Sequence, residues 1–290
     1  MRFLKRSIAA FSGKAGSAGG RPAYTLPPGE RIYAIGDIHG RFDCLGRLLP
    51  QIALDRRGYN GRVSIVFLGD YVDRGPESRK VLDLLSSPKL KDSLQSETCI
   101  FLRGNHEDVM LRFLSEPSLG PEWANFGGLE TLRSYKALQG LPVRPSDWRK
   151  VSEALLSHMP PEHLAFLQAT SFCHHHGPFF FAHAGVLPGV ALDAQSPEDL
   201  MWIRDTFLRS RAEHGALIIH GHSPSATPDI RDNRIGIDTG AYLTGLLTAA
   251  VIEGDGIRFI DSGDAQSGPR CSAEIPVNRS DSSATTSLSG

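Results

Sequence analysis

Short, nearly continuous runs of apolar residues recur along the chain, and most are rich in β-branched or aromatic side chains. Runs of this kind are typical of β-strands that are buried on both faces. They predict strands at residues 32–35, 63–68, 99–102, 179–182 and 216–219. Two further strands, at 246–252 and 257–260, flank Glu253-Gly254-Asp255-Gly256, which favours a hairpin turn.

Amphipathic patterns between these runs predict helices at residues 42–52, 76–85 and 108–114. Pro50 is expected to end or kink the first of them. Residues 123–167 look helical but carry no cluster of ligand-type side chains, so we expect a helical cap inserted beside the site. Strands that alternate with helices in this way predict an α/β fold.

Composition divides the 290 residues into three parts. Residues 1–28 are basic and rich in glycine, serine and alanine, and they predict a flexible leader. Residues 29–261 predict one globular domain with a substantial core. Residues 262–290 lose hydrophobic periodicity and are rich in serine, which predicts a disordered tail.

Charge and composition exclude several classes of partner. A formal net charge of -1 offers no general attraction to nucleic acid. No apolar window approaches the roughly 20 residues that span a bilayer, so no stable membrane association is expected. The four cysteines are far apart and suit a reduced, cytoplasmic setting. We expect the protein to act as a monomer.

Polar motifs follow the ends of the predicted strands. Gly36-Asp37-Ile38-His39-Gly40 comes first, then the run from Gly69 to Gly75, and then Gly104-Asn105-His106-Glu107. Two histidine runs, residues 181–185 and 219–223, come later. Because ligands gather at the carboxyl ends of strands in open α/β sheets, we expect these motifs to meet in one crevice.

Carboxylate, imidazole and amide oxygen are the ligands that borderline divalent ions accept, and so the motifs predict a two-metal site. Two such ions activate a hydroxide and neutralise the phosphoryl group during in-line attack at phosphorus. We expect manganese, with iron or zinc as alternatives. The candidate ligands are Asp37 and His39 for one ion, Asp70 as the bridge, and Asn105, His183 and His222 for the other.

Phosphate esters also need phosphate-binding groups and a proton for the leaving alkoxide. Arg74 and Arg204 are the candidate phosphate-binding arginines. His106 is the candidate proton donor and Asp73 its orienting carboxylate. His220 is either phosphate-facing or a buried histidine with a backbone partner, while Arg204 could instead pair with an acidic neighbour.

Taken together, the GDIHG, GDYVDRG, LRGNHE, HAG and GHS runs resemble the phosphoprotein phosphatase family of calcineurin-like metallophosphoesterases. The likeness implies a four-layer αββα sandwich of mixed sheets and hydrolysis of phosphoserine or phosphothreonine on proteins. It places the same residues as metal ligands and catalytic pair. The last third, around residues 237–242, is more similar to the bacterial and phage branch that includes lambda phosphatase.

Two alternatives remain beside a protein phosphatase. A relative, the symmetrical diadenosine tetraphosphate hydrolase, shares most of the pattern, but there we expect alanine at the position of Asp73 and aspartate at that of Glu107. A catalytically silent binding module would lack a ligand or the His106 and Asp73 pair. Small phosphoesters are therefore possible substrates as well as phosphoproteins.

Several other polar residues have simpler explanations. His174, His175 and His176 are expected in an exposed loop. Arg103 is expected to brace the interior, and Tyr242 suits either the crevice or the core. Surface positions are expected for His158, His163 and His214.

Overall fold

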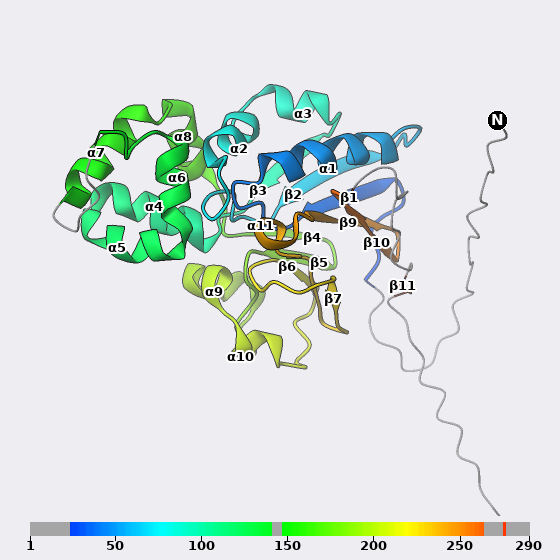
Figure 1. Cartoon of the computed structure of the whole chain (residues 1–290). Helices are drawn as coiled ribbons and strands as arrows, with labels where there is room; N and C mark the ends of the chain where they lie inside the picture. Colours follow the sequence, from blue (N-terminus) through cyan, green and yellow to red (C-terminus); the bar gives the residue numbers. More distant parts are fainter. Residues whose placement is uncertain (1–23, 141–146, 264–274, 277–290) are drawn as a thin grey trace, which may run out of the picture.

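The computed structural model describes residues 24–140, 147–263 and 275–276. Two mixed sheets form its centre (Figure 1). The first sheet has the strand order β11-β10-β9-β1-β2-β3, and the second has the order β4-β5-β6-β8-β7. The strands of the first sheet are β1 (Glu30–Ile35), β2 (Arg62–Phe67), β3 (Thr98–Phe101), β9 (Thr248–Glu253), β10 (Gly256–Asp261) and β11 (Ile275–Pro276). Those of the second are β4 (Cys173–His176), β5 (Phe179–Ala182), β6 (Leu217–His220), β7 (Asp229–Ile230) and β8 (Arg234–Gly236).

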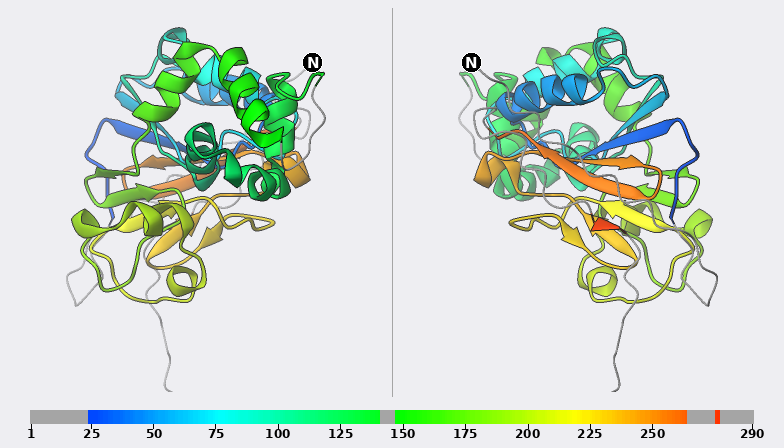
Figure 2. Two further views of the ribbon diagram at one scale, coloured as in Figure 1. Left: turned by 90° about the vertical axis from the view of Figure 1, so that its left-hand side faces the viewer. Right: turned by 90° about the vertical axis from the view of Figure 1, so that its right-hand side faces the viewer.

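Helices cover both outer faces of the paired sheets, which makes four layers (Figure 2). The first sheet is covered by α1 (Phe42–Asp55), α2 (Ser78–Leu85) and the short α3 (Lys89–Ser93). The second sheet is covered by α9 (Pro197–Trp202) and α10 (Asp205–Leu208), and α11 (Ala241–Thr244) precedes β9. The predicted four-layer α/β sandwich is thus confirmed.

Alternation along the strands assigns side chains to separate cores. In β1, Tyr33 and Ile35 face the helices, whereas Ile32 and Ala34 pack between the two sheets. Phe181 of β5 joins that inter-sheet core from the opposite side. A third cluster lies under α9 and α10. Each sheet is therefore buried on both faces, as the apolar runs predicted.

A helical region lies beside one end of the sandwich and contains the predicted cap (Figure 1). It includes α4 (Asn105–Ser115), α5 (Gly120–Trp123), a π-helical turn (Ala124–Gly128), α6 (Leu129–Ser134), α7 (Trp148–His158) and α8 (Pro161–Ala169). Gly127 breaks this run with φ 104°, a left-handed conformation that glycine adopts without strain. Part of the predicted cap, residues 141–146, lies outside the described residues.

Some local predictions were wrong. Pro50 lies inside α1 and does not end it, because Leu49 and Ile52 remain buried on the sheet while Pro50 faces solvent. The triple histidine forms the edge strand β4, which pairs with β5 in antiparallel register. His163 is buried, because Tyr135 and Asp83 provide partners for both ring nitrogens.

The boundaries also differ at both ends of the domain. Tyr24 and Leu26 of the predicted leader are buried against the inter-sheet core. Ser262, the first residue of the predicted tail, is fully buried and its hydroxyl accepts from the Leu247 N–H at 2.8 Å. The rest of the leader and most of the tail lie outside the described residues. In the described part of the chain, no helix is long and apolar enough to cross a membrane.

Candidate active site

The predicted ligands meet at the carboxyl ends of β1, β2 and β3 of the first sheet and of β5 and β6 of the second. All six candidates are buried: Asp37 and His39 after β1, Asp70 after β2, Asn105 after β3, His183 after β5 and His222 after β6. Asp70 lies between His39, which follows a strand of the first sheet, and His183, which follows a strand of the second. Its Oδ2 is 3.3 Å from Nε2 of His39, and its Oδ1 is 3.4 Å from Nε2 of His183. This is the place expected of a bridging carboxylate.

Backbone carbonyls orient two of the imidazoles. Nδ1 of His183 donates to the Leu68 carbonyl at 2.9 Å, and Nδ1 of His39 donates to the Val72 carbonyl at 2.9 Å. In the neutral rings each Nε2 then carries a lone pair directed into the site. A carbonyl that fixes the tautomer in this way is the usual support for a metal-ligating histidine.

Around His183, polar atoms of three side chains converge, and two of these atoms, Nε2 of His183 and Oδ1 of Asn105, are both acceptors. Its Nε2 lies 3.0 Å from Oδ1 of Asn105 and 3.2 Å from Nδ1 of His222. Nε2 of His222 is buried and has no hydrogen-bond partner among the described residues. Converging lone pairs of nitrogen and oxygen fit a borderline divalent cation.

The expected division of the ligands between two ions, with Asp70 as the bridge, agrees only in part with the clusters in the structure. Two clusters have ligand atoms within 4.8 Å of one another, namely Asp70 with His183 and His222, and Asp70 with His39 and His106. Asp37 belongs to neither cluster, and its carboxylate accepts from the backbone N–H of His222 at 3.0 Å. Arg74 lies over the second cluster and donates to Nε2 of His39 at 2.9 Å and of His106 at 3.1 Å.

Burial keeps the candidate histidine ligands neutral. It lowers the pKa of His39 to about 3 and that of His222 to about 2. Neutral imidazole is the form that binds a metal. Burial also acts to raise the pKa of Asp70, but the surrounding imidazoles, His183 first, outweigh burial and leave it below its usual value. For Asp37, burial and the neighbouring Asp238 and Asp70 raise the pKa well above its usual value.

His106 and Asp73 form the predicted pair. Nδ1 of His106 lies 2.7 Å from Oδ2 of Asp73, and both side chains are buried. Burial acts to lower the pKa of His106, but Asp70 and Asp73 outweigh burial and raise it. Protonation of Nε2 would require the Arg74 contact to open, since a guanidinium can only donate. The pair therefore suits a proton donor that becomes available when Arg74 engages an anion.

Backbone conformation around the site is unusual. Among the described residues, seven non-glycine residues have positive φ, and five of them belong to the site: His39, Asp70, Asp73, Arg74 and His222. Such conformations cost free energy and persist only where the surroundings hold them.

Glu107 holds the backbone after β2. Its carboxylate accepts from the N–H groups of Asp70, Tyr71 and Gly104 at 2.7 to 2.9 Å and from that of Val72 at 3.2 Å. Burial and the nearby Asp70 raise its pKa to about 8. Sequence reasoning used Glu107 only to separate families and missed this positioning role.

The cap supplies a second support that the sequence did not reveal. Nε1 of Trp123 donates to Oδ2 of Asp73 at 2.8 Å, and the Thr131 hydroxyl donates to Oδ1 at 2.6 Å. Trp123 lies on α5 and Thr131 on α6, about 50 residues beyond Asp73 in the chain. The glycine turn contributes as well, because the Gly127 carbonyl accepts from the Arg74 N–H.

The remaining candidates lie in different surroundings. Arg204 is exposed and forms no ion pair among the described residues, while Asp205 pairs with Arg209. His220 is not in the phosphate-facing place considered for it. Its ring packs edge-on against Phe207, with centroids 5.1 Å apart, and its Nδ1 contacts the Gly221 carbonyl. His220 is thus the buried histidine of the alternative interpretation.

Tyr242 and Arg103 are also placed by the structure. The Tyr242 ring lies 4.5 Å below the Arg74 guanidinium and 5.2 Å from the ring of His39, so Tyr242 lines the site. Arg103 donates to Thr170 and to two backbone carbonyls, which confirms the internal brace.

Comparison with known proteins also indicates a phosphoesterase. A family model for calcineurin-like phosphoesterases matches residues 30–252. The asymmetrical bis(5'-nucleosyl)-tetraphosphatase PrpE of Anoxybacillus flavithermus (strain DSM 21510 / WK1) is 27% identical over 74% of this chain and 87% of its own length. The serine/threonine-protein phosphatase PP1-delta of Caenorhabditis elegans is 38% identical, but over 26% of this chain and 22% of its own length.

A solved structure shares the fold. That of a cold-active protein tyrosine phosphatase has a TM-score of 0.53 and 16% identity, and the match covers 89% of this chain and 84% of that one. These relatives do not single out the phage-like branch. The family match spans well over half of the residues and includes every ligand motif. The chain belongs to the calcineurin-like phosphoesterase family.

Proposed function

We propose that the protein is a metal-dependent phosphomonoesterase whose substrates are phosphoserine and phosphothreonine side chains of proteins. The observation that carries this proposal is the buried His106 and Asp73 pair beside Asp70. An alkoxide is a strongly basic leaving group and needs a proton as the P–O bond breaks. A nucleotide phosphate leaves without that help, so a built proton donor favours alkyl phosphate esters.

Six residues would hold two divalent ions: Asp37, His39, Asp70, Asn105, His183 and His222. The ions, when bound, supply a water of lowered pKa and positive charge for the phosphoryl oxygens. We propose manganese, with iron or zinc as alternatives, because the mixed nitrogen and oxygen ligands suit all three.

The chain's own groups would bind and orient the phosphate. Arg74 offers a planar guanidinium already directed into the site, and Arg204 offers a second from the rim. Engagement of Arg74 by the phosphate frees Nε2 of His106. Asp73 then holds the imidazolium by its Nδ1 and faces it toward the leaving oxygen.

A second candidate is hydrolysis of dinucleoside tetraphosphates. It is favoured by the relative named as an asymmetrical bis(5'-nucleosyl)-tetraphosphatase, whose match covers most of both chains. That relative is named for the asymmetrical reaction, whereas the alternative considered from the motifs is the symmetrical hydrolase. Product analysis separates the two, since asymmetrical cleavage of diadenosine tetraphosphate yields ATP and AMP and symmetrical cleavage yields two ADP.

Initial rates of the manganese-loaded protein test the proposal. We expect kcat/KM to be higher on phosphoserine and phosphothreonine peptides than on diadenosine tetraphosphate. The reverse order would reject a protein substrate in favour of the dinucleotide.

His106→Asn tests the role of the proton donor. The variant should lose about 10²- to 10⁴-fold in rate on phosphopeptides, where the leaving group needs a proton. On p-nitrophenyl phosphate, whose leaving group is weakly basic, the loss should be much smaller. Because His106 also lies in a candidate metal cluster, metal content must be measured on the same sample. A variant that lacks an ion and loses both activities equally would make His106 a ligand instead.

The protein is further proposed to act as a monomer in the cytoplasm. Cys44, Cys99 and Cys173 are free thiols, as a reducing compartment requires, while Cys271 lies outside the described residues.

A further inference from the structure

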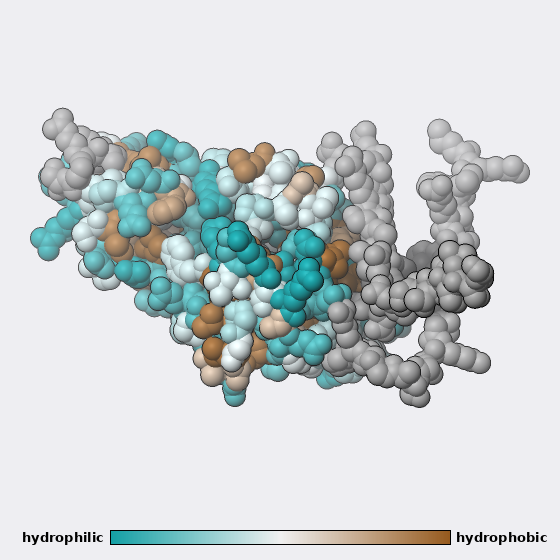
Figure 3. Space-filling model, turned by 90° about the horizontal axis from the view of Figure 1, so that it is seen from below, coloured by the Kyte–Doolittle hydropathy of each residue, from teal (hydrophilic) through white to brown (hydrophobic). Residues whose placement is uncertain are grey.

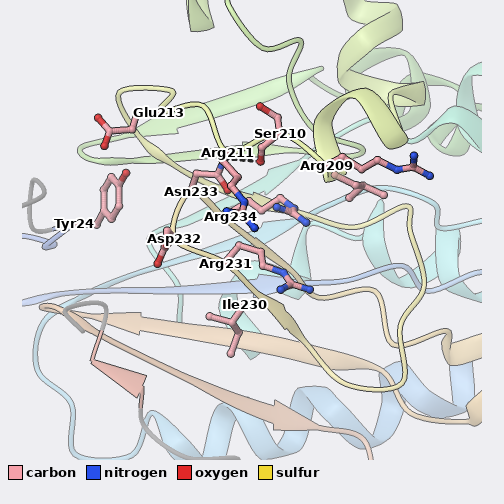
Figure 4. A pocket seen from close by; sticks show the side chains of 11 residues that line it. Tyr24, Arg209, Ser210, Arg211, Glu213, Ile230, Arg231, Asp232, Asn233 and Arg234 are labelled. Carbon is pink, nitrogen blue, oxygen red and sulfur yellow. Dashed lines mark hydrogen bonds between the residues drawn. The ribbon is translucent and has the colours of Figure 1, made fainter. Parts of the chain in front are cut away.

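A second cavity lies at the opposite end of the second sheet from the metal ligands. Its walls come from residues 208–213, which precede β6, and from the turn at residues 230–234, which joins β7 to β8. Strands β6 and β8 are parallel, and His220 and His222 follow the carboxyl end of β6. The cavity is therefore at the amino ends of these strands, away from the catalytic groups. Figure 4 shows the side chains that line it.

Four arginines line this cavity: Arg209, Arg211, Arg231 and Arg234. Two carboxylates, Glu213 and Asp232, also line it, and Arg209 pairs with Asp205 on α10. The case for an anion therefore rests on Arg231 and Arg234 rather than on the number of arginines. The surrounding face, on the side of α9 and α10, is largely hydrophilic, with apolar residues in small separate patches (Figure 3).

The two walls are tied together. Nδ2 of Asn233 donates to the Ser210 carbonyl at 3.1 Å and to the Ala212 carbonyl at 2.8 Å. The Arg231 N–H donates to the Arg234 carbonyl and closes the β7–β8 turn. Hydrogen bonds thus hold the two backbone segments that bear the arginines. This reduces the entropic cost of ordering the arginines around a ligand.

Arg234 is the most unusual member. It is 5% exposed, and its Nε has no hydrogen-bond partner among the described residues. Its NH2 group shares one carboxylate, that of Asp229, with Arg231, at 3.1 and 2.7 Å respectively. The two guanidinium groups thus share one carboxylate, and the buried Nε of Arg234 is left without an acceptor in the described part of the chain. A buried donor without an acceptor costs free energy, and an anion in the cavity would supply the missing acceptor.

We propose that this cavity binds a phosphorylated small molecule, with its phosphate group against Arg231 and Arg234 and its organic part against the rest of the wall. A cavity of about 750 Å³ is larger than a phosphate alone requires and lies within the range of small-molecule sites. Leu208 and Ile230 give that organic part apolar contacts. Planar guanidinium forks suit phosphate oxygens. This site does not depend on the proposed reaction.

Isothermal titration calorimetry of the full chain with AMP tests the proposal, with EDTA present to prevent hydrolysis. We expect saturable binding of AMP and competition by inorganic phosphate. Adenosine should not bind, because it lacks the anionic group. Binding of adenosine as tight as that of AMP would reject a phosphate site. So would a dissociation constant for AMP weaker than roughly 1 mM.

Variants locate the binding. Arg234→Gln and Arg231→Gln should each weaken AMP about tenfold or more, because each removes a charge-assisted contact. Arg234 is buried and its variant could unfold, so the exposed Arg231 and an Arg211→Gln variant keep the test decisive. Arg149→Gln, on the distant helix α7, is the matched control and should bind as the wild type does. Equal AMP affinity in Arg231→Gln, Arg211→Gln and the control would assign the binding to the catalytic centre and overturn the proposal.

Discussion

Asp70 is the residue on which both halves of the site depend. Each of its carboxylate oxygens faces a different imidazole, one contributed by each sheet. Its backbone has φ 51°, and Glu107 holds that conformation through the Asp70 N–H. The side chain therefore has little freedom to move aside if its charge is removed.

Replacing Asp70 with asparagine should abolish turnover and metal binding together. The amide keeps the shape but presents one oxygen and an uncharged NH2 group where two anionic oxygens stood. Plasma mass spectrometry of the purified variant, alongside a phosphopeptide assay, measures both effects. Asp92→Asn on the exposed helix α3 should keep metal and activity. Two ions per chain with near-normal turnover in Asp70→Asn would refute the bridging assignment.

Residues of the site differ in how far the sequence predicts their roles. Asp37, Asp70 and Asn105 follow apolar runs and have glycine neighbours, a local signal of strand ends that point into a crevice. Trp123 and Thr131 have no such signal. Their role arises from contacts with Asp73 across about 50 residues of chain, and an indole or hydroxyl in a helix is usually just packing.

Among the elements, the short helices α5 and α6 of the cap do more than cover the site. They place two donors on Asp73, which in turn holds His106. The cap is therefore expected to affect the rate of catalysis as well as the shape of the substrate groove.

Trp123→Phe tests this link. The substitution keeps a buried aromatic ring but deletes the donor to Asp73, and we expect kcat on phosphopeptides to fall about tenfold with little change in KM or metal content. Trp148→Phe is a matched control in the same region, because Nε1 of Trp148 has no hydrogen-bond partner among the described residues. An equal fall in kcat in both variants would show that packing, not the hydrogen bond, is responsible.

The cap also contains a buried histidine whose protonation should oppose folding. Neutral His163 satisfies both of its nitrogens, since Nδ1 accepts from the Tyr135 hydroxyl at 2.7 Å and Nε2 donates to Asp83 at 3.1 Å. Burial lowers the pKa of His163, and the nearby Asp83 only partly offsets burial. In the unfolded chain the pKa returns to about 6.5, so the unfolded state takes up the proton first.

His163 should therefore stabilise the fold above about pH 6.5 and lose that contribution as the pH falls. Thermal unfolding of the wild type and of His163→Gln at a series of pH values between about 5 and 8 measures it. The Tm advantage of the wild type should shrink toward acid. An advantage that is constant or grows toward acid would show that the pKa is not lowered. His158→Gln, an exposed histidine on α7, is the control.

The prediction of helices and strands succeeded where the hydrophobic pattern of a segment determines its structure. Strand β5 lies at the predicted residues 179–182, because Phe179-Phe180-Phe181-Ala182 is buried on both faces. It failed where pairing with a neighbouring strand or packing against another element determines the structure. Strand β4, which is Cys173 followed by three histidines, forms because it pairs with β5, and β8 contains a buried Arg234 that no hydrophobic pattern would select. Pro50 was misread because the packing of α1 on the sheet outweighs a local breaking tendency of about 3 kcal/mol.

At the scale of the whole molecule, the site joins the two sheets. Asp37, His39, Asp70 and Asn105 belong to the first sheet's strand ends, and His183 and His222 belong to the second. Sequence order could predict that these residues converge, because each follows a strand. It could not predict the second cavity, whose arginines come from a loop and a turn that approach each other only in the folded chain.

Metal ions that bind between the sheets should raise the stability of the entire fold. Ions bound by the native state alone add about 2.7 kcal/mol to the free energy of unfolding when their concentration is 100 times the dissociation constant. We expect manganese to raise the Tm of the wild type and EDTA to lower it, in a single cooperative transition. Asp70→Asn should lose this response. Because its ligands span both sheets, the ion should protect β5 and β6 from hydrogen exchange as well as β1 and β2. Protection confined to the first sheet would show that the second sheet's histidines do not take part in metal binding.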